Sequence, residues 1–501
     1  MGEPEKKEGE ENAGGFYAKA ILEPIYRQAQ EQLLAPVNAV NKAHLIMLAE
    51  QGLIGEEEAQ AIAKALLGLD LAKLATSRYT GRFEDLFFEV EHELTKAAGE
   101  AAGSLHLARS RNDMGIAVYR IALREKLLRT LDAGLELRSR LIEFAEKHVD
   151  TLMLGYTHTQ QAQPTTMAHY ALAVSDSLAR DFCRLKAAYA NCNRSSMGAA
   201  ALTGSGFAID RLRTAELLGF GEVIENTYDA VSGADYVGEA ATATSLAAVN
   251  LGRFAQELLL WCTQEFAAIR VADPFVQISS IMPQKRNPVS IEHARSLLSS
   301  CAGDAATVLT MIHNTPFGDI VDTEDDLQPY AWRCLRTLET VYRLLAGIIA
   351  TLEVNADALR SRAEASFAAT TELADTLVRR EGLAFRVSHS IVSRLIRDAD
   401  AEGLAVRELT PERLNAAAEA VLGRPLRLTA DELAEALDPG HFVSVRQLRG
   451  GPSPKEVERA LRGQWERLDG ERTRLDRERE LQKSRAAELD EILVAWLRPR
   501  G

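Results

Sequence analysis

The sequence lacks the features that mark secreted, membrane-spanning and zinc-binding proteins. Its five cysteines, at positions 183, 192, 262, 301 and 334, are scattered, with no CxxC pair and no histidine at ligand spacing. This pattern favours reduced thiols in a cytoplasmic protein over a disulfide framework or a metal site. No apolar run approaches the roughly 18–20 residues that a membrane span needs. The formal charge of −14 argues against a nucleic-acid partner, because proteins that bind nucleic acids normally carry a basic surface.

Signals for β-strands are also scarce, and helical periodicity dominates. Alternating β-branched runs between tight turns are nearly absent. Within residues 121–150, one apolar stripe recurs at spacings of three, four or seven: Leu128, Leu131, Leu135, Ile142, Ala145 and Val149. Similar patterns run through 165–190, 236–270, 289–313 and 329–353. We therefore predict an all-α fold, a bundle of long helices whose apolar stripes are partly buried between subunits.

The composition divides the chain into four regions. Residues 1–15 are charged and glycine-rich, without the apolar core of a signal peptide, and predict a disordered tail. Residues 16–108 predict an N-terminal helical domain, and 109–364 predict the central long-helix bundle. Residues 365–501 predict a C-terminal domain of shorter helices with Pro/Gly-rich breaks. Its last charged stretch, 462–497, is interpreted as a terminal helix with a solvated face.

The segment SSIMPQKRNP (279–288) interrupts these helices with an unusual set of polar groups. Pro283 and Pro288 exclude helix before residue 288, and Asn287 followed by Pro288 predicts an N-cap and a first turn. Lys285 and Asn287 would then lie at the positive end of a helix dipole, a place that suits developing negative charge. The alternative interpretation is a flexible interhelical loop with a routine cap.

Two further polar segments precede predicted helices. LHLARSRNDMG (105–115) places Ser110, Arg111 and Asn112 at a helix start, where arginine matches a carboxylate with two parallel donors. GYTHTQQAQPTT (155–166) places Thr157, His158 and Gln163 in a polar loop, and histidine can shuttle a proton near neutrality. Taken singly, the first is also explained as a helix cap with exposed charge, and the second as a structural histidine.

Together the three segments resemble a known family. SSIMPQKRNP resembles the signature GSSxMPxKxNP of the fumarase/aspartase superfamily, with Ile278 in place of the glycine. SRND, THTQQAQP, AIDRLRTAELLGF (208–220) and NTYDAVS (226–232) narrow the resemblance to the argininosuccinate lyase family. SVRQLRGGPSPKEV (444–457) is similar to its C-terminal segment. The resemblance implies three helical domains, a homotetramer with active sites shared by three subunits, and no metal or organic cofactor.

The resemblance also implies roles for individual residues. Ser279 would be the base that removes a proton beside a carboxylate, activated by Lys285 and the helix N-terminus. His158, paired with Glu292 from another subunit, would assist protonation of the leaving nitrogen. The substrate-binding residues would be Ser110, Arg111, Asn112, Thr157, Gln163, Ser280, Met282, Asn287, Asp319 and Glu324.

Three departures from the family pattern bear on the substrate. Where the family carries LPLAYNKDLQEDKEP, this chain has TPFGDIVDTEDDLQP (315–329), so that Asp319, Glu324 and Leu327 replace a tyrosine, a glutamine and a lysine. AVSGAD (230–235) replaces AVSDRD, and Phe87 replaces a histidine. The lost lysine would have paired with the arginine carboxylate, whereas the acids could attract a protonated amine.

We therefore predict a carbon–nitrogen lyase that releases fumarate from an N-substituted aspartate with a cationic amine half. The resemblance implies ethylenediamine-N,N'-disuccinate as the substrate, because the family includes a lyase of this kind. The alternatives are an authentic argininosuccinate lyase with a divergent pocket and a non-catalytic structural relative.

Overall fold

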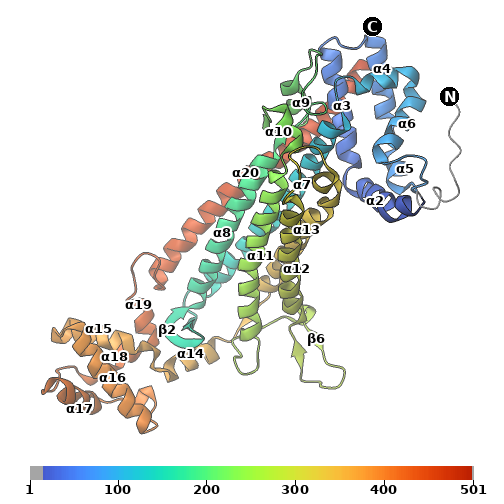
Figure 1. Ribbon diagram of the computed structural model, residues 1–501. Coiled ribbons are helices and arrows are strands. Elements are labelled where there is room, and N and C mark those ends of the chain that lie inside the picture. The colour runs from blue at the N-terminus through green and yellow to red at the C-terminus, as the bar shows by residue number, and fades with distance from the viewer. Residues whose placement is uncertain (1–14, 499–501) are drawn as a thin grey trace.

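The computed structural model describes residues 15–498, and helices dominate it, which confirms the predicted all-α fold. Its centre is a bundle of five long helices (Figure 1): α7 (Arg111–Lys147), α8 (Met167–Cys192), α11 (Asp235–Trp261), α12 (Val289–Ile312) and α13 (Gln328–Ala350). All five lie where helical periodicity predicts them. Residues 1–14 of the predicted disordered tail lie outside the described residues.

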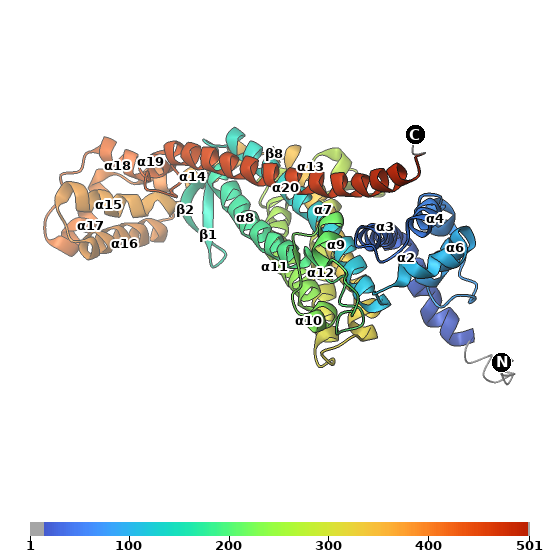
Figure 2. The ribbon, with the colours of Figure 1, turned by 90° about the horizontal axis from the view of Figure 1, so that it is seen from above.

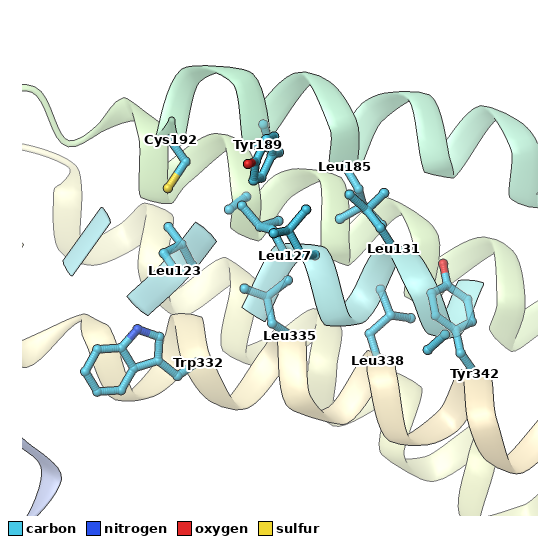
Figure 3. Close-up of a cluster of buried hydrophobic side chains, with 14 of the residues drawn as sticks. Leu123, Leu127, Leu131, Leu185, Tyr189, Cys192, Trp332, Leu335, Leu338 and Tyr342 are labelled. Carbon is cyan, nitrogen blue, oxygen red and sulfur yellow. The ribbon is translucent and has the colours of Figure 1, made fainter. Parts of the chain in front are cut away.

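The predicted apolar stripe of α7 forms the centre of the bundle. Leu128, Leu131 and Leu135 are buried there, as are Ile142 and Ala145. Figure 3 shows how α7 lies between two neighbours, with side chains of α8 and of α13 packed against it. Close packing of side chains in this core prevents the long helices from sliding past one another. The core therefore fixes the positions of the helix ends, where the polar segments lie.

A smaller group of helices caps one end of the bundle. It contains α2 (Glu23–Gln32), α3 (Leu34–Glu50), α4 (Glu56–Leu67), α5 (Leu71–Thr76) and α6 (Leu86–Ala98), with the π-helix η1 (Ala18–Leu22) and the 3-10 helix η2 (Gly99–His106). Its apolar side chains belong to the same core cluster as those of the bundle. No helix among residues 15–498 combines the length and the apolar character needed to cross a bilayer.

The C-terminal region divides into two parts. Short helices lie at the other end of the bundle (Figures 1 and 2): α14 (Ala356–Ala365), α15 (Thr370–Glu381), α16 (Phe385–Ala401), α17 (Pro411–Leu422), α18 (Ala430–Leu437) and α19 (Pro439–Ser444). The helices α15 to α18 share a core of their own, whereas α14 packs on the main core and α19 on a small cluster with β1. Two 3-10 turns, η5 (Phe367–Ala369) and η6 (Val406–Glu408), connect them. The 43-residue α20 (Pro454–Trp496) then runs back along the bundle and buries Leu461, Leu468 and Leu475. Only its outer side is the solvated face that its charge predicts.

Short strand pairs interrupt the helical architecture, and two of them lie in polar segments that the sequence analysis places outside helices. β1 (Leu152–Thr157) pairs with β2 (Gln160–Thr166), so the expectation of a polar loop over 155–166 is wrong. β6 (Gln277–Ile278) pairs with β7 (Arg286–Asn287), and β5 (Ile269–Arg270) pairs with β8 (Glu353–Val354). A parallel contact joins β3 (Arg194–Ser195) to β4 (Glu222–Val223).

The predicted N-cap at Asn287 is wrong by one residue. α12 begins at Val289 with Pro288 in the cap position, and no side chain caps it. Asn287 is instead paired with Gln277 in the β6–β7 ladder. The pairing keeps its backbone extended, which is also the conformation that a following proline favours.

Candidate functional site

Ser110 starts α7 as the sequence predicts. Its hydroxyl accepts a hydrogen bond from the backbone N–H of Asn112 at 3.4 Å and donates to the Asn112 Oδ1 at 2.7 Å. Asp113 completes a capping box, because its Oδ1 accepts from the Ser110 N–H at 2.8 Å. The side chains of residues 110–112 therefore lie at the positive end of a 37-residue helix.

Asp113 has a second role that the sequence analysis missed. It is fully buried, and its Oδ2 accepts from the backbone N–H of Gly198 at 2.8 Å. The Ser196 hydroxyl donates to the Asp113 carbonyl at 2.7 Å, so the start of α7 is tied to the 196–200 turn. Burial raises the pKa of Asp113 to about 6, although three backbone N–H donors act in the opposite direction. The Ser–x–x–Asp spacing was the signal for the cap, whereas nothing in the sequence indicates the contact with Gly198.

The groups predicted to bind substrate carboxylates contact carboxylates of the chain itself. The Arg111 Nη1 lies 2.9 Å from the Asp85 Oδ2 and 3.7 Å from the Glu84 Oε1. The Asn112 Nδ2 donates to the Asp319 Oδ2 at 2.5 Å. The segments 110–112 and 319–324, more than two hundred residues apart, therefore form one cluster at this end of the bundle.

Glu324 belongs to the π-helix η4 (Asp322–Asp326), and its side chain lies beside that of Asp319. Burial, a hydrogen bond to Asp319 and the charges of Asp319 and Asp325 raise the pKa of Glu324 to about 9. Burial also raises the pKa of Asp325, which accepts a hydrogen bond from the Tyr119 hydroxyl. The Glu324 carboxyl therefore holds its proton more tightly than an exposed glutamate does.

Ser279 lies at the start of the β6–β7 connection. Its Oγ accepts hydrogen bonds from the backbone N–H of Met282 at 3.0 Å and of Ile281 at 3.3 Å. Two donors aimed at one hydroxyl oxygen stabilise its ionised form. Ile278 and Ile281 are 76% and 83% exposed, which is unusual for isoleucine and leaves apolar surface beside the serine uncovered in the single chain.

Lys285, Asn287 and Glu292 surround the start of α12. Lys285 is exposed and forms no ion pair within residues 15–498. The first turn of α12 contains Glu292 and has no side-chain cap. Its first backbone N–H groups therefore have no side-chain acceptor and carry the partial positive charge of the helix N-terminus. Arg286 fixes the base of the hairpin by donating to the Val271 carbonyl at 3.0 Å. Ser280 and Met282 lie in the same exposed connection.

His158 occupies the tip of the β1–β2 hairpin. His158 and Thr159 have φ of 51° and 64°, as a two-residue hairpin turn with left-handed backbone requires. Thr157 pairs with Gln160 at the last position of the ladder, and the imidazole is exposed. Gln163, on β2, lies with its Nε2 3.5 Å from the Thr371 hydroxyl of α15. His158 is therefore an exposed residue at the tip of the hairpin.

One chain does not collect these groups in one place. The start of α7, where Asn112 contacts Asp319, lies at one end of the bundle, and β2 and β6 of the two hairpins lie at the other (Figure 1). At 1.5 Å per residue, α7 alone separates Ser110 from the β1–β2 hairpin by about 55 Å. In the described part of the chain, no group of three or more His, Cys, Asp or Glu side chains is placed to hold a metal ion.

Comparisons with known proteins identify relatives over nearly the whole chain. A family model described as "Lyase" matches residues 28–303, and one described as "Argininosuccinate lyase C-terminal" matches 367–444. Argininosuccinate lyase 2 of Agrobacterium fabrum is 36% identical over 481 residues, 96% of this chain and 95% of the relative. Argininosuccinate lyase of Methanocaldococcus jannaschii is 36% identical over 455 residues, 91% of this chain and 92% of the relative.

Solved structures agree with these sequence matches. A crystal structure of EDDS lyase in complex with formate superposes with a TM-score of 0.86 at 31% identity, covering 93% of both chains. A class II fumarase from Schistosoma mansoni superposes with a TM-score of 0.68 at 15% identity, covering 86% of this chain and 94% of the fumarase, which shows the shared fold alone.

Proposed function

This chain belongs to the argininosuccinate lyase family and is a carbon–nitrogen lyase, and from that premise we propose that it eliminates fumarate from an N-substituted aspartate whose amine half is a cation. The reverse reaction adds an amine to fumarate. We take ethylenediamine-N,N'-disuccinate, or a similar aminocarboxylate, as the substrate class that fits the acidic residues at 319–326.

The chemistry requires a base and a place for negative charge. Ser279 would remove the proton from the carbon beside a carboxylate, and the electrons would settle on that carboxylate as a dianion. The N–H groups of Ile281 and Met282 support an ionised Ser279. Lys285, Asn287 and the uncapped start of α12 would hold the dianion, and one well-placed donor of this kind contributes about 3–4 kcal/mol.

Proton delivery to the leaving nitrogen is assigned to His158 with Glu292 from another subunit. The exposed position of His158 at a hairpin tip supports a role toward a neighbouring copy. General acid catalysis of this kind typically contributes 10²–10⁴-fold, by order of magnitude.

A homotetramer would bring the separated segments together. The clusters lie at opposite ends of the bundle, so a complete site needs a second copy of the chain. Apolar side chains stand exposed on α11 (Leu246, Val249) and α12 (Leu297, Leu309), as expected of helices that pack against other subunits. The uncovered Ile278 and Ile281 beside Ser279 support the same assembly.

The contact between Asn112 and Asp319 is the observation that carries the choice of substrate. It places the carboxylate of Asp319 and the carboxyl of Glu324 directly beside the segment that would hold the succinyl half. An ammonium group binding there would pair with the Asp319 carboxylate.

The alternative is authentic argininosuccinate lyase activity, which is favoured by the names of relatives that are 36% identical. Both activities would release fumarate by the same catalytic residues. The two activities differ in the amine half of the substrate, which would lie beside Asp319 and Glu324.

An amine panel with fumarate separates the two. We expect adduct formation with ethylenediamine to exceed turnover of argininosuccinate, measured by fumarate absorbance in each direction. Asp319→Asn should raise the KM for ethylenediamine about tenfold, equivalent to ~1.4 kcal/mol, because one charge partner is lost.

Propylamine provides the control substrate, because it has similar length and no second ammonium group. Its KM should change little in Asp319→Asn. Turnover of argininosuccinate faster than every diamine addition would contradict the proposed substrate and support the alternative.

A further inference from the structure

Two exposed aromatic rings lie beside the Asn112–Asp319 contact. Tyr228 and Phe317 have ring centroids 6.0 Å apart with planes 16° from parallel. They are 43% and 63% exposed, although aromatic rings contribute most when buried. Tyr228 is fixed by the start of α10 (Thr227–Ser232), where its N–H donates to the Asn226 Oδ1 at 2.8 Å.

The rings are close to the acidic residues by chain geometry. Phe317 precedes Asp319 by two residues, which limits the distance between their Cα atoms to about 7 Å. A Cβ built on the intervening Gly318 would lie 3.9 Å from the Tyr228 hydroxyl. The stacked pair and the carboxylate of Asp319 therefore face the same small region of surface.

We propose that Tyr228 and Phe317 form a subsite for the hydrocarbon body of the amine half, which rests on the proposed function. A substrate that pairs an ammonium with Asp319 would lay a ring or alkyl chain against the two aromatic faces. Flat hydrocarbon extends the stack, and a cation near an aromatic face gains further attraction. Among the diamines that pair with Asp319, the subsite thus favours those in which a ring lies between the two nitrogens.

Charge and shape together identify this occupant. The carboxylates of Asp319 and Asp325, both close to Glu324, favour a cation over a neutral or anionic molecule. A purely hydrophilic diamine would leave both rings in water. A purely apolar molecule would form no ion pair with Asp319.

The test compares p-xylylenediamine with ethylenediamine as partners for fumarate in the full-length enzyme. We expect Phe317→Ala and Tyr228→Ala each to lower the ratio of kcat/KM for p-xylylenediamine over ethylenediamine about 3–10-fold, as the loss of one aromatic contact implies. Phe385→Ala is the matched control, since Phe385 is 49% exposed and also contacts a neighbouring ring, that of His389, in the C-terminal helices.

Calorimetric titration of p-xylylenediamine without fumarate separates this inference from the proposed function. If no amine reacts with fumarate but binding weakens in Phe317→Ala, the subsite stands and the proposed function fails. An unchanged kcat/KM ratio in active variants, or equal or absent binding in wild type and Phe317→Ala, overturns the subsite. Loss of assembly mass in Phe317→Ala also overturns it, because the ring would then pack between copies.

Discussion

The Asp113 carboxylate accepts a hydrogen bond from the Gly198 N–H at 2.8 Å, which joins the start of α7 to a turn 85 residues further along the chain. The same carboxylate caps α7 through the Ser110 N–H. Gly198 has φ of +81°, and a Cβ there would lie 2.6 Å from the Arg211 Cγ, so the turn accepts only glycine without rearrangement. Asp113 thus positions Ser110, Arg111 and Asn112 without being exposed itself.

Asp113→Asn should lower activity more than stability. The asparagine amide keeps one oxygen acceptor, but its NH₂ group would face one of the backbone N–H groups that the carboxylate now accepts from. That hydrogen bond is lost, so the 110–112 segment should no longer be held in place. We expect KM for the succinyl substrate to rise about tenfold, equivalent to ~1.4 kcal/mol. Steady-state kinetics beside thermal unfolding would measure this. Asp70→Asn, at the exposed cap of α5, is the control that should leave KM unchanged.

The same variant should change how stability depends on pH. The pKa of Asp113 is raised from 3.8 to about 6 in the fold, so the folded state binds more protons than the unfolded state between these values. The contribution of this group to stability is therefore present below pH ~4 and lost as the pH rises through about 6. The Tm of wild type relative to Asp113→Asn should fall across that range, and a constant difference would contradict the assignment.

Ser279→Ala should abolish turnover while leaving assembly intact. The hydroxyl is exposed in part and accepts only local backbone N–H groups, so its loss should cost little stability. Removing the base should cost at least about 10²–10⁴-fold in kcat. Ser299→Ala, on the outer side of α12, is the control for a lost exposed hydroxyl. Near-normal turnover of Ser279→Ala would move the role to Ser280, whose alanine variant is then the next to measure.

Two inactive variants should restore activity when mixed. Asn112→Ala damages one end of the bundle and Ser279→Ala the other, so a site shared between subunits can combine the intact ends. Random mixing in equal amounts should restore about a quarter of the sites. Activity after joint unfolding and reassembly would report this, with each variant reassembled alone as the control. No recovery from properly assembled mixtures would contradict shared sites.

The ion pair of Arg138 with Glu471 should be a main attachment of α20 to α7. Both side chains are almost fully buried. Arg138→Met leaves Glu471 as an uncompensated buried charge and should lower the free energy of unfolding by about 3–5 kcal/mol. Arg394→Met, which breaks an exposed pair with Asp398, should change it by about 0.5 kcal/mol at most. Denaturant unfolding monitored by circular dichroism would distinguish the two.

Local signals in the sequence predicted the elements that depend on neighbours along the chain. The stripe through Leu128, Leu131 and Leu135 predicted α7, and Ser110 predicted where it starts. The β1–β2 hairpin was missed because its residues near the tip are polar on both faces and show no alternation of apolar and polar side chains. Asn287 was misassigned because an Asn–Pro pair fits a helix cap and an extended strand equally well, and only Gln277 decides between them.

The sequence by itself therefore determined the helical class, the positions of the long helices and the polar segments proposed to carry the chemistry, because these follow from periodicity and local capping. Only the tertiary structure decided that Asn112 meets Asp319, that Asp113 holds Gly198, and that Ser279 lies at the opposite end of the bundle. Those relationships depend on the way in which the long helices pack side by side. Packing brings together residues that are far apart along the chain, and no local sequence pattern indicates such pairs.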